Sequence, residues 1–562
     1  MEQRDHRLLG WLWQVSGRQK WNILWLTILE ILIGGSGVLF AMLLRGVINA
    51  AVESLAELFW QQAFYLIGLT ALQLILRAGI RFLEELLRSG LENLFKGRLF
   101  SVLLNREYAN VTAVHSGEWL NRLTSDTVVV AEGLSTILPD LSGMLVQLVG
   151  AVVMLLYLIP GIGWLVLPLG FLFSILTFGF RKILKKLHKN IQEKDGVLRI
   201  FLSERLTNLL VVRSFVKEQE TNATAERKME EHQKARLKRN HFSNLCNLGF
   251  GLIMRGSYAA GAIACGFGIL KGTMSYGNLM AVLHLIGQIQ SPFANLSGYL
   301  PKYYAMLASA ERLREAEGYP QEPVKKKSRE EIAQLYRNYL QEIIFDHVTF
   351  AYAGMEKPGQ AVLNDVSFQL RKGEYLAVTG HSGCGKSTVL KILMSLYHPE
   401  KGEVFITQKS GEIILDASYR GLFAYVPQGN QLISGTIREI VAFGDEGCMQ
   451  EEGQIWKALE IAEAAEFVKE LPEGLDARLG ERGLGLSEGQ IQRLAIARAI
   501  MSCHPILLLD EATSSLDEAT EKRVLCNLRG MTDRSVIIVT HRMSALEICD
   551  KRVILDNISD PQ

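Results

Sequence analysis

Long apolar runs dominate the first half of the sequence. They lie near residues 21–48, 58–82, 134–159, 163–181, 245–270 and 278–302. An α-helix needs about 20 apolar residues to cross roughly 30 Å of hydrocarbon, and each run approaches that length. The pattern therefore predicts an all-α transmembrane domain with six spans.

The charges between these runs predict how the spans are oriented. Glu53 and Glu57 separate the first two runs without any lysine or arginine, and Lys271 is the only cation between the last two. The Pro160-Gly161 turn joins the third and fourth runs. The remaining connecting segments are rich in lysine and arginine, which favours the cytoplasmic side. We therefore expect a multi-pass protein of a bacterial plasma membrane with both termini in the cytoplasm.

Two polar segments between the runs are too long to be simple turns. Residues 83–133 and 182–244 lack proline and are rich in Leu, Glu, Lys and Arg. The helical spacing of apolar residues such as Leu202 and Leu206 favours packed helices over a solvated linker. We expect both segments to extend the spans into the cytoplasm. Residues 1–20 mix basic and apolar side chains and predict a short helix at the membrane surface.

The second half of the chain has a different pattern. Short buried-strand runs alternate there with helical runs, which predicts a soluble α/β domain. We expect a transmembrane domain over residues 1–325, a charged linker over 326–340 and the α/β domain over 341–562. The formal net charge of +1 argues against a nucleic-acid partner. Seven scattered cysteines without CxxC spacing predict reduced thiols and neither a zinc site nor disulfides.

A glycine-rich segment in the second half predicts a phosphate-binding loop. It follows a strand-like run at 375–378 and opens a helical run at 389–393, the context in which backbone amides wrap phosphates. Lys386 is suited to the β and γ phosphates of ATP, and the Ser387 hydroxyl is suited to Mg²⁺. The predicted nucleotide-binding residues of the segment are Gly380, Ser382, Gly383, Cys384, Gly385, Lys386, Ser387 and Thr388. The fold class is therefore an α/β P-loop NTPase.

Polar residues that end other strand-like runs predict the chemistry. The run at 506–509 leads into Asp510, a candidate Mg²⁺ ligand, and Glu511, a candidate for polarising the attacking water. Gln428 and His541 end two further runs, and Gln428 could reach either Mg²⁺ or the water. A strand-end Asp or His is common in structural roles, so each residue alone is weak evidence. Their shared order along the chain makes coincidence a poor explanation.

Two more segments suggest contacts with the nucleotide. Leu486–Gln490 precedes an amphipathic helix, whose start is suited to an anion. Tyr352 lies ahead of the phosphate loop, where its ring could stack on a purine. The alternative for Tyr352 alone is a core tyrosine.

Taken together, these segments resemble the nucleotide-binding domain of the ATP-binding cassette superfamily. In that resemblance GHSGCGKST is Walker A, Gln428 the Q-loop, LSEGQ (with Ser487, Gly489 and Gln490) the signature, ILLLDE (with Asp510 and Glu511) Walker B, SSLD (with Asp517) the D-loop, His541 the switch histidine and Tyr352 the adenine-stacking aromatic. Leu479–Gly483, His115–Glu118 and Arg122–Asp126 resemble exporter segments. Glu488 departs from the usual first glycine of the signature. The family continues with a turn and a helix where this sequence stops at Gln562.

The resemblance implies an exporter-type half-transporter that uses ATP and Mg²⁺. It implies two cassettes paired head to tail, with each ATP between Walker A of one subunit and Ser487 of the other. The partner would be a second copy or a related half-transporter, surrounded by membrane lipids. Export of an amphipathic or lipophilic compound by alternating access is the implied function, and an importer built on the exporter fold, as in siderophore uptake, is the alternative. A soluble cassette ATPase is disfavoured by the six spans.

Charged residues inside the apolar runs carry two further expectations. Glu30 and Arg77 are predicted to pair, because each would be costly alone in hydrocarbon. Arg255, with Gln288, is a candidate for a substrate cavity. The alternative for Arg255 is pairing with the carboxylate of Asp140.

Overall fold

The computed structural model describes residues 2–159, 163–322, 327–352, 361–409, 411–429, 432–444, 447, 449–480 and 485–555. Its contacts divide the chain into two compact units. The helical unit comprises residues 1–102 and 117–317. The α/β unit comprises residues 103–116 and 318–562. Residues 103–116, predicted as part of the membrane domain, therefore pack with the α/β unit.

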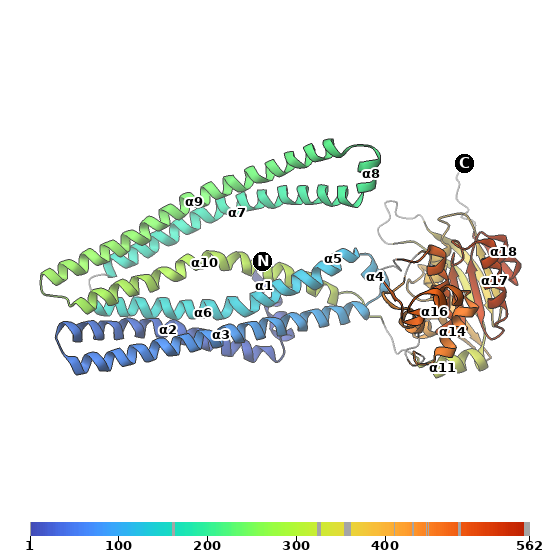
Figure 1. The fold of residues 1–562 in the computed structure, drawn as a ribbon, viewed down its shortest axis with the longest axis horizontal. Helices are drawn as coiled ribbons and strands as arrows, with labels where there is room; N and C mark the ends of the chain where they lie inside the picture. Colours follow the sequence, from blue (N-terminus) through green and yellow to red (C-terminus); the bar gives the residue numbers. More distant parts are fainter. Residues whose placement is uncertain are drawn as a thin grey trace. The chain divides into compact units, whose positions relative to one another are not determined.

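The helical unit contains the long helices that the apolar runs predict (Figure 1). Its helices are α1 (Glu2–Val15), α2 (Gln19–Val52), α3 (Ala56–Leu104), α5 (Ser116–Asn121), η1 (Arg122–Asp126), α6 (Thr127–Leu158), α7 (Gly163–Thr207), α8 (Leu209–Ser214), α9 (Glu218–Leu270) and α10 (Tyr276–Glu317). In the described residues, the stretches with the length and hydropathy of a span are Gln19–Val52, Ala56–Leu104, Ser116–Leu158 and Glu218–Leu270. The runs predicted at 163–181 and 278–302 lie within α7 and α10, and the side chains there are described only in part.

Glycines bring α2 and α6 together. A Cβ added at Gly34 would lie 2.3 Å from the carbonyl oxygen of Gly143, so the two backbones nearly touch. Small residues allow such close helix packing in membranes, where van der Waals contact replaces the hydrophobic effect as the driving force. The adjacent Gly35 has room, because its added Cβ would meet only Val146, at 3.9 Å.

This contrast predicts that Gly34→Ala destabilises the helical unit, whereas Gly35→Ala does not. Overpacking of this kind costs roughly 1–3 kcal/mol. Both substitutions change helix propensity alike. The difference between their effects on stability therefore reports the contact between α2 and α6. Thermal unfolding of the purified protein in detergent measures it, and equal midpoints would contradict the prediction.

The first helix packs on the protein as well as being amphipathic. Leu8 and Leu12 of α1 are buried, and the Trp11 indole donates to Glu317 of α10 at 3.0 Å. The Trp11 ring also lies 6.1 Å from that of Phe95 in α3. At least part of the apolar face predicted to lie on the membrane is therefore covered by α3 and α10.

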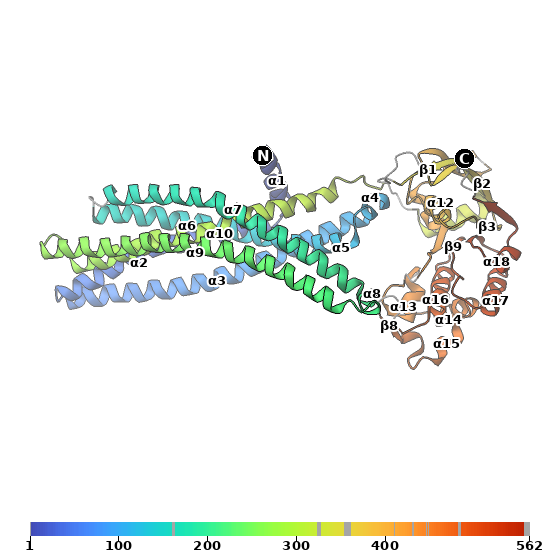
Figure 2. The ribbon, with the colours of Figure 1, turned by 90° about the horizontal axis from the view of Figure 1, so that it is seen from above.

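The α/β unit is built on two larger sheets and a two-stranded ribbon (Figure 2). A parallel sheet has the order β11-β3-β10-β9-β6, and an antiparallel sheet has the order β2-β1-β4-β5. The strands are β1 (Leu340–Phe350), β2 (Leu363–Arg371), β3 (Tyr375–Thr379), β4 (Lys401–Gln408), β5 (Gly411–Ile414), β6 (Phe423–Val426), β7 (Gly435–Thr436), β8 (Arg478–Leu479), β9 (Ile506–Asp510), β10 (Ser535–Val539) and β11 (Lys551–Ile554). Strands β3, β9 and β10 are buried throughout, as their unbroken apolar sequences predict.

Helices cover this framework. They are α4 (Tyr108–Thr112), α11 (Arg329–Gln334), η3 (Leu335–Tyr339), α12 (Lys386–Leu393), η4 (Ala417–Leu422), α13 (Ile437–Val441), η5 (Ala442–Gly444), α14 (Glu452–Ile461), α15 (Ala465–Glu470), η7 (Gly474–Asp476), α16 (Glu488–Met501), α17 (Glu518–Arg529) and α18 (Met543–Glu547).

Part of the predicted linker is folded. Residues 329–339 form α11 and η3, and Ile332 and Tyr336 are buried in the core of the α/β unit. Ser328 and Glu331 form a capping box that starts α11. The linker assignment at 326–340 rested on charge density and overlooked this Ser-x-x-Glu signal.

Candidate functional site

The glycine-rich loop joins the parallel strand β3 to α12. Gly380 and Gly385 have positive φ angles of 151° and 96°. A Cβ at Gly380 would lie 2.4 Å from the carbonyl oxygen of Leu555, and one at Gly385 would lie 2.6 Å from Leu363 Cδ2. Only glycine fits these two positions. The loop therefore has the tight turn that exposes backbone amides to a phosphate chain.

The predicted phosphate ligands lie on this loop. Lys386 Nζ donates to the carbonyl oxygens of Gly380 and His381 at 3.0 and 2.9 Å, so the side chain curls over the loop. Ser382 and Gly383 are exposed, whereas Cys384 and Thr388 are buried beneath. The buried Cys384 therefore contributes packing and its backbone amide to the loop.

Asp510, the last residue of β9, lies at the edge where this loop ends. Its side chain is buried, and its Oδ2 accepts a hydrogen bond from Tyr425 Oη at 3.0 Å. In the described residues, Oδ1 has no hydrogen-bond partner of good geometry. Burial raises the pKa of Asp510, while the hydroxyl groups of Ser387 and Tyr425 favour its charged form. A buried carboxylate oxygen without a partner, beside a serine hydroxyl, fits a hard cation such as Mg²⁺.

The three predicted catalytic side chains meet at one point. Gln428 Nε2 donates to Glu511 Oε2 at 2.7 Å, and His541 Nε2 lies 3.7 Å from Glu511 Oε1. Glu511 has a positive φ of 49°, and its amide donates to the carbonyl of Val539, the last residue of β10. This hydrogen bond holds the carboxylate at the carboxyl edge of the parallel sheet, where ligands bind in α/β folds.

Tyr352 belongs to an aromatic cluster. Its hydroxyl lies 2.9 Å from Thr388 Oγ1, and its ring packs edge-on against Phe350 and Tyr397 at centroid distances of 4.9 and 5.2 Å. Tyr397 in turn packs edge-on against Tyr108 of α4 at 5.8 Å. Tyr352 is only half-buried, and its hydroxyl group lies beside the helix that follows the phosphate loop. Its stacking on a purine stays a prediction.

The predicted signature segment starts α16. The Ser487 hydroxyl accepts from the Gln490 amide, and the Gln490 side chain accepts from the Ser487 amide. A Cβ at Gly489 would lie 3.0 Å from the carbonyl oxygen of Ser515, so the helix start packs closely against the loop after Glu511. Gln492, which lies outside the predicted motifs, accepts from the Ser515 amide at 3.0 Å.

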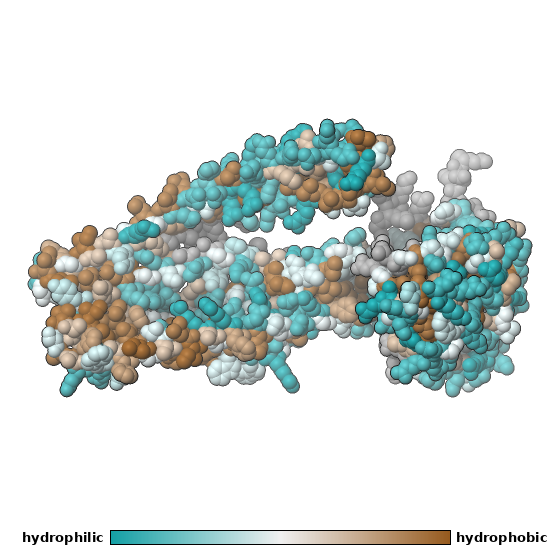
Figure 3. All heavy atoms as spheres, viewed as in Figure 1, coloured by the Kyte–Doolittle hydropathy of each residue, from teal (hydrophilic) through white to brown (hydrophobic). Residues whose placement is uncertain are grey.

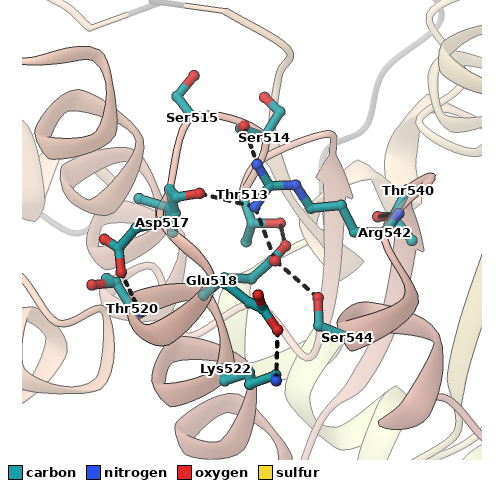
Figure 4. Close-up of polar contacts among 12 residues, drawn as sticks. Thr513, Ser514, Ser515, Asp517, Glu518, Thr520, Lys522, Thr540, Arg542 and Ser544 are labelled. Atoms are coloured by element: carbon teal, nitrogen blue, oxygen red, sulfur yellow. Dashed lines mark hydrogen bonds and ion pairs between the residues drawn. The ribbon is translucent and has the colours of Figure 1, made fainter.

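A clamp centred on Arg542 fixes the loop that contains Asp517 (Figure 4). Arg542 donates to the carbonyl oxygens of Leu516 and Ser514 at 2.9 and 2.6 Å and pairs with the buried Glu521 at 2.9 Å. Asp517 caps α17 by accepting from the Thr520 amide, a hydrogen bond that lowers the pKa of Asp517. Arg542 follows His541 directly, so these hydrogen bonds connect the backbone beside the histidine to the loop that contains Asp517.

The residues predicted inside the membrane form different contacts from those expected. In the described part of the chain, Glu30 and Arg77 make no ion pair within 4.0 Å. Arg77 is exposed, whereas Glu30 packs against Gly143 of α6. The two side chains therefore form no direct salt bridge in this structure.

Arg255 and Gln288 are the two residues predicted for a substrate cavity. Asp140 accepts a hydrogen bond from Tyr299 at 2.7 Å. Among the described residues, Asp140 and Arg255 form no ion pair within 4.0 Å. Arg255 is exposed on α9. Gln288 lies 3.2 Å from His284 and packs against Gly37 of α2. The cavity assignment of both residues stays a prediction.

Both halves of the chain match known families. Residues 23–293 match the ABC transporter transmembrane region, and residues 363–514 match the family described as ABC transporter. The mouse ATP-binding cassette sub-family B member 10, mitochondrial, is 30% identical over 487 residues, which is 85% of this chain and 67% of the mouse protein. A multidrug resistance ABC transporter ATP-binding and permease protein of Lactococcus lactis subsp. lactis is 31% identical over 68% of this chain and 62% of its own length.

A solved structure has the same fold. The structure of a bacterial Atm1-family ABC exporter with ATP bound aligns with a TM-score of 0.75 and 23% sequence identity. The alignment covers 94% of this chain and 92% of the other. The predicted combination of a helical membrane domain with a cassette-type α/β domain is confirmed.

Proposed function

We propose that this chain, which belongs to the ATP-binding cassette transporter family, exports an amphipathic or lipophilic compound by alternating access as a dimer of two copies. As a multi-pass membrane protein of that family, it binds and hydrolyses ATP and couples hydrolysis to transport. The compound class, the dimer and the alternating access are the parts that we propose. The named relatives support export as the direction.

The hairpin formed by α7, α8 and α9 provides the main support for the proposed dimer. In Figure 1 it separates from α6 and α10 toward α8. Its tip is apolar: Leu210 is 82% exposed, Val216 is 81% exposed, and Phe215 is also exposed. Figure 3 shows this apolar tip beyond a hydrophilic stretch of the same hairpin. Apolar side chains gathered at the end of a projecting hairpin mark a protein contact. In the proposed dimer, the second copy of the chain supplies this contact.

The ATP chemistry follows from the carboxyl edge of the parallel sheet. In the proposed dimer, ATP lies between the phosphate loop of one copy and Ser487 of the other. Glu511 polarises the attacking water, and Gln428 and His541, which contact its two carboxylate oxygens, orient it. Closure around ATP drives the spans outward-facing, and hydrolysis resets them.

Ser387, Asp510 and Gln428 would hold Mg²⁺. When bound, Mg²⁺ neutralises charge on the phosphate oxygens. Within the described residues, Oδ1 of Asp510 has no hydrogen-bond partner of good geometry, which supports this assignment. Both termini are proposed to lie in the cytoplasm of a bacterial cell, where ATP is available.

Transport by the purified protein in liposomes tests the proposal. A panel of drugs, lipids and peptides is first screened for stimulation of ATPase activity. A stimulating compound should then move from the face that carries the α/β unit to the opposite face, and only with ATP. Movement of the compound toward the α/β unit would support the importer alternative instead.

The hairpin tip allows a separate prediction. Leu210→Asp should lower substrate-stimulated ATPase activity and transport roughly tenfold, because losing the burial of a leucine costs about 1.5–3 kcal/mol. Ile200→Asp is the matched control, since Ile200 is 70% exposed on α7 but lies farther from the tip. Substrate-stimulated ATPase activity and transport are both measured for the two variants. Equal activities in Leu210→Asp and Ile200→Asp would show that the tip makes no functional contact.

A further inference from the structure

Tyr425 lies on β6, next to the strand β9 that ends in Asp510. Strands β6 and β9 are parallel neighbours, and Tyr425 is paired in register with Leu508. Side chains two residues apart on a strand share a face, so Asp510 lies on the same face as Leu508, one diagonal step from Tyr425. A tyrosine is long enough to bridge that step, and its Oη donates to Asp510 Oδ2 at 3.0 Å.

This hydrogen bond gives the two carboxylate oxygens of Asp510 different environments. Oδ2 is taken by Tyr425, whereas Oδ1 has no partner of good geometry within the described residues. A carboxylate held through one oxygen cannot rotate freely, so the other oxygen keeps a fixed direction. Groups that orient a metal ligand in this way affect metal affinity although they never touch the metal.

The segment that follows β6 also reaches the second acid. Gln428, three residues after Tyr425, donates to Glu511. The end of β6 therefore contacts both acids at the end of β9, Asp510 through Tyr425 and Glu511 through Gln428. The Tyr425 ring packs on the core cluster that also contains Val389 and Leu390 of α12, so the phenol is anchored independently of its hydroxyl group.

We propose that Tyr425 is a positioning residue for the divalent cation, and that its hydroxyl group fixes Asp510 so that Oδ1 points at Mg²⁺. This inference rests on the Mg²⁺ site proposed above. It assigns a role to a residue outside the predicted motifs. A purely structural tyrosine is the competing explanation, and the two differ in what happens to the metal dependence of ATP binding.

The test compares ATP affinity with Mg²⁺ and with EDTA in full-length protein that carries Glu511→Gln to prevent hydrolysis. The measured quantity is the factor by which Mg²⁺ tightens ATP binding. Tyr425→Phe keeps the ring and removes the hydroxyl group. It should reduce this factor about tenfold, since loss of a residue that orients a metal ligand typically costs 10–100-fold in metal affinity. ATP affinity in EDTA should stay unchanged.

Two controls make the result decisive. Tyr336→Phe removes another buried tyrosine hydroxyl group, which lies 2.9 Å from Ser535 Oγ and away from the site, and should leave the factor unchanged. Asp510→Ala should abolish the enhancement of ATP binding by Mg²⁺.

The outcomes separate the two proposals. If Asp510→Ala abolishes the enhancement by Mg²⁺ and Tyr425→Phe does not reduce it, the role of Tyr425 is refuted while the Mg²⁺ site stands. If Asp510→Ala leaves it intact, the proposed Mg²⁺ site itself is wrong. A loss of affinity by Tyr425→Phe in EDTA and Mg²⁺ alike would identify a structural tyrosine.

Discussion

Glu511→Gln is expected to bind ATP and Mg²⁺ normally but to hydrolyse ATP at least about a hundredfold more slowly. A positioned general base contributes roughly 10²–10⁴-fold to a rate, and glutamine cannot accept the proton. The amide oxygen of glutamine can still accept the hydrogen bond that Gln428 Nε2 now donates to Glu511. The geometry of the site should therefore survive, and the protein should accumulate as a closed dimer that retains ATP.

Lys386→Ala provides the contrast. Lys386 curls over the phosphate loop and carries the cation expected to meet the phosphates, so its loss should lower ATP affinity and prevent closure. ATP turnover and retained nucleotide, measured for both variants in nanodiscs, separate the two effects. Near-normal turnover in Glu511→Gln would show that the base lies elsewhere, and the site assignment would fail.

Glu521→Ala should strongly destabilise the α/β unit. The Glu521 carboxylate is 1% exposed and accepts from Thr513 Oγ1, Ser544 Oγ and Arg542 Nη1 at 2.7–2.9 Å. Removing one partner of a buried ion pair costs about 3–5 kcal/mol. We expect a cost near the low end of this range, because Arg542 is 37% exposed and its guanidinium group can be solvated by water. Turnover should also fall, because the loop from Ser514 to Leu516 loses its anchor.

Glu518→Ala is the matched control for this effect. Glu518 lies on the same helix and pairs with Lys522 at 2.8 Å, but both side chains are exposed (Figure 4). Exposed pairs of this kind contribute little to stability. The thermal transition of the α/β unit should therefore shift by several degrees for Glu521→Ala and not measurably for Glu518→Ala. Similar midpoints for the two variants would mean that the clamp around Arg542 does not stabilise the unit.

The features that depend on strand order were the most predictable from the sequence. Gln428, Asp510, Glu511 and His541 each end a strand-like run, and the carboxyl ends of parallel strands meet at one edge, so their convergence required no knowledge of distances. Tyr425 was missed because its role depends on the register of β6 against β9, which the sequence does not encode locally.

Other features escaped because they depend on tertiary contacts. Arg542 and Gln492 are ordinary helix or loop residues until the loop from Ser514 to Leu516 folds against them. The expected pair of Glu30 and Arg77 was derived from depth alone. Depth does not determine the direction in which a helix presents its side chains.

The packing of residues 103–116 with the α/β unit affects how the two halves can be studied apart. A soluble fragment that begins at residue 318 would lack α4, and with it Tyr108. Tyr397, which also packs edge-on against Tyr352, would then lose its contact with Tyr108. Nucleotide affinities measured on such a fragment would describe a site in which the aromatic cluster around Tyr352 lacks Tyr108. Supplying α4 as a separate peptide, or grafting it onto the fragment, would restore the contact between Tyr108 and Tyr397.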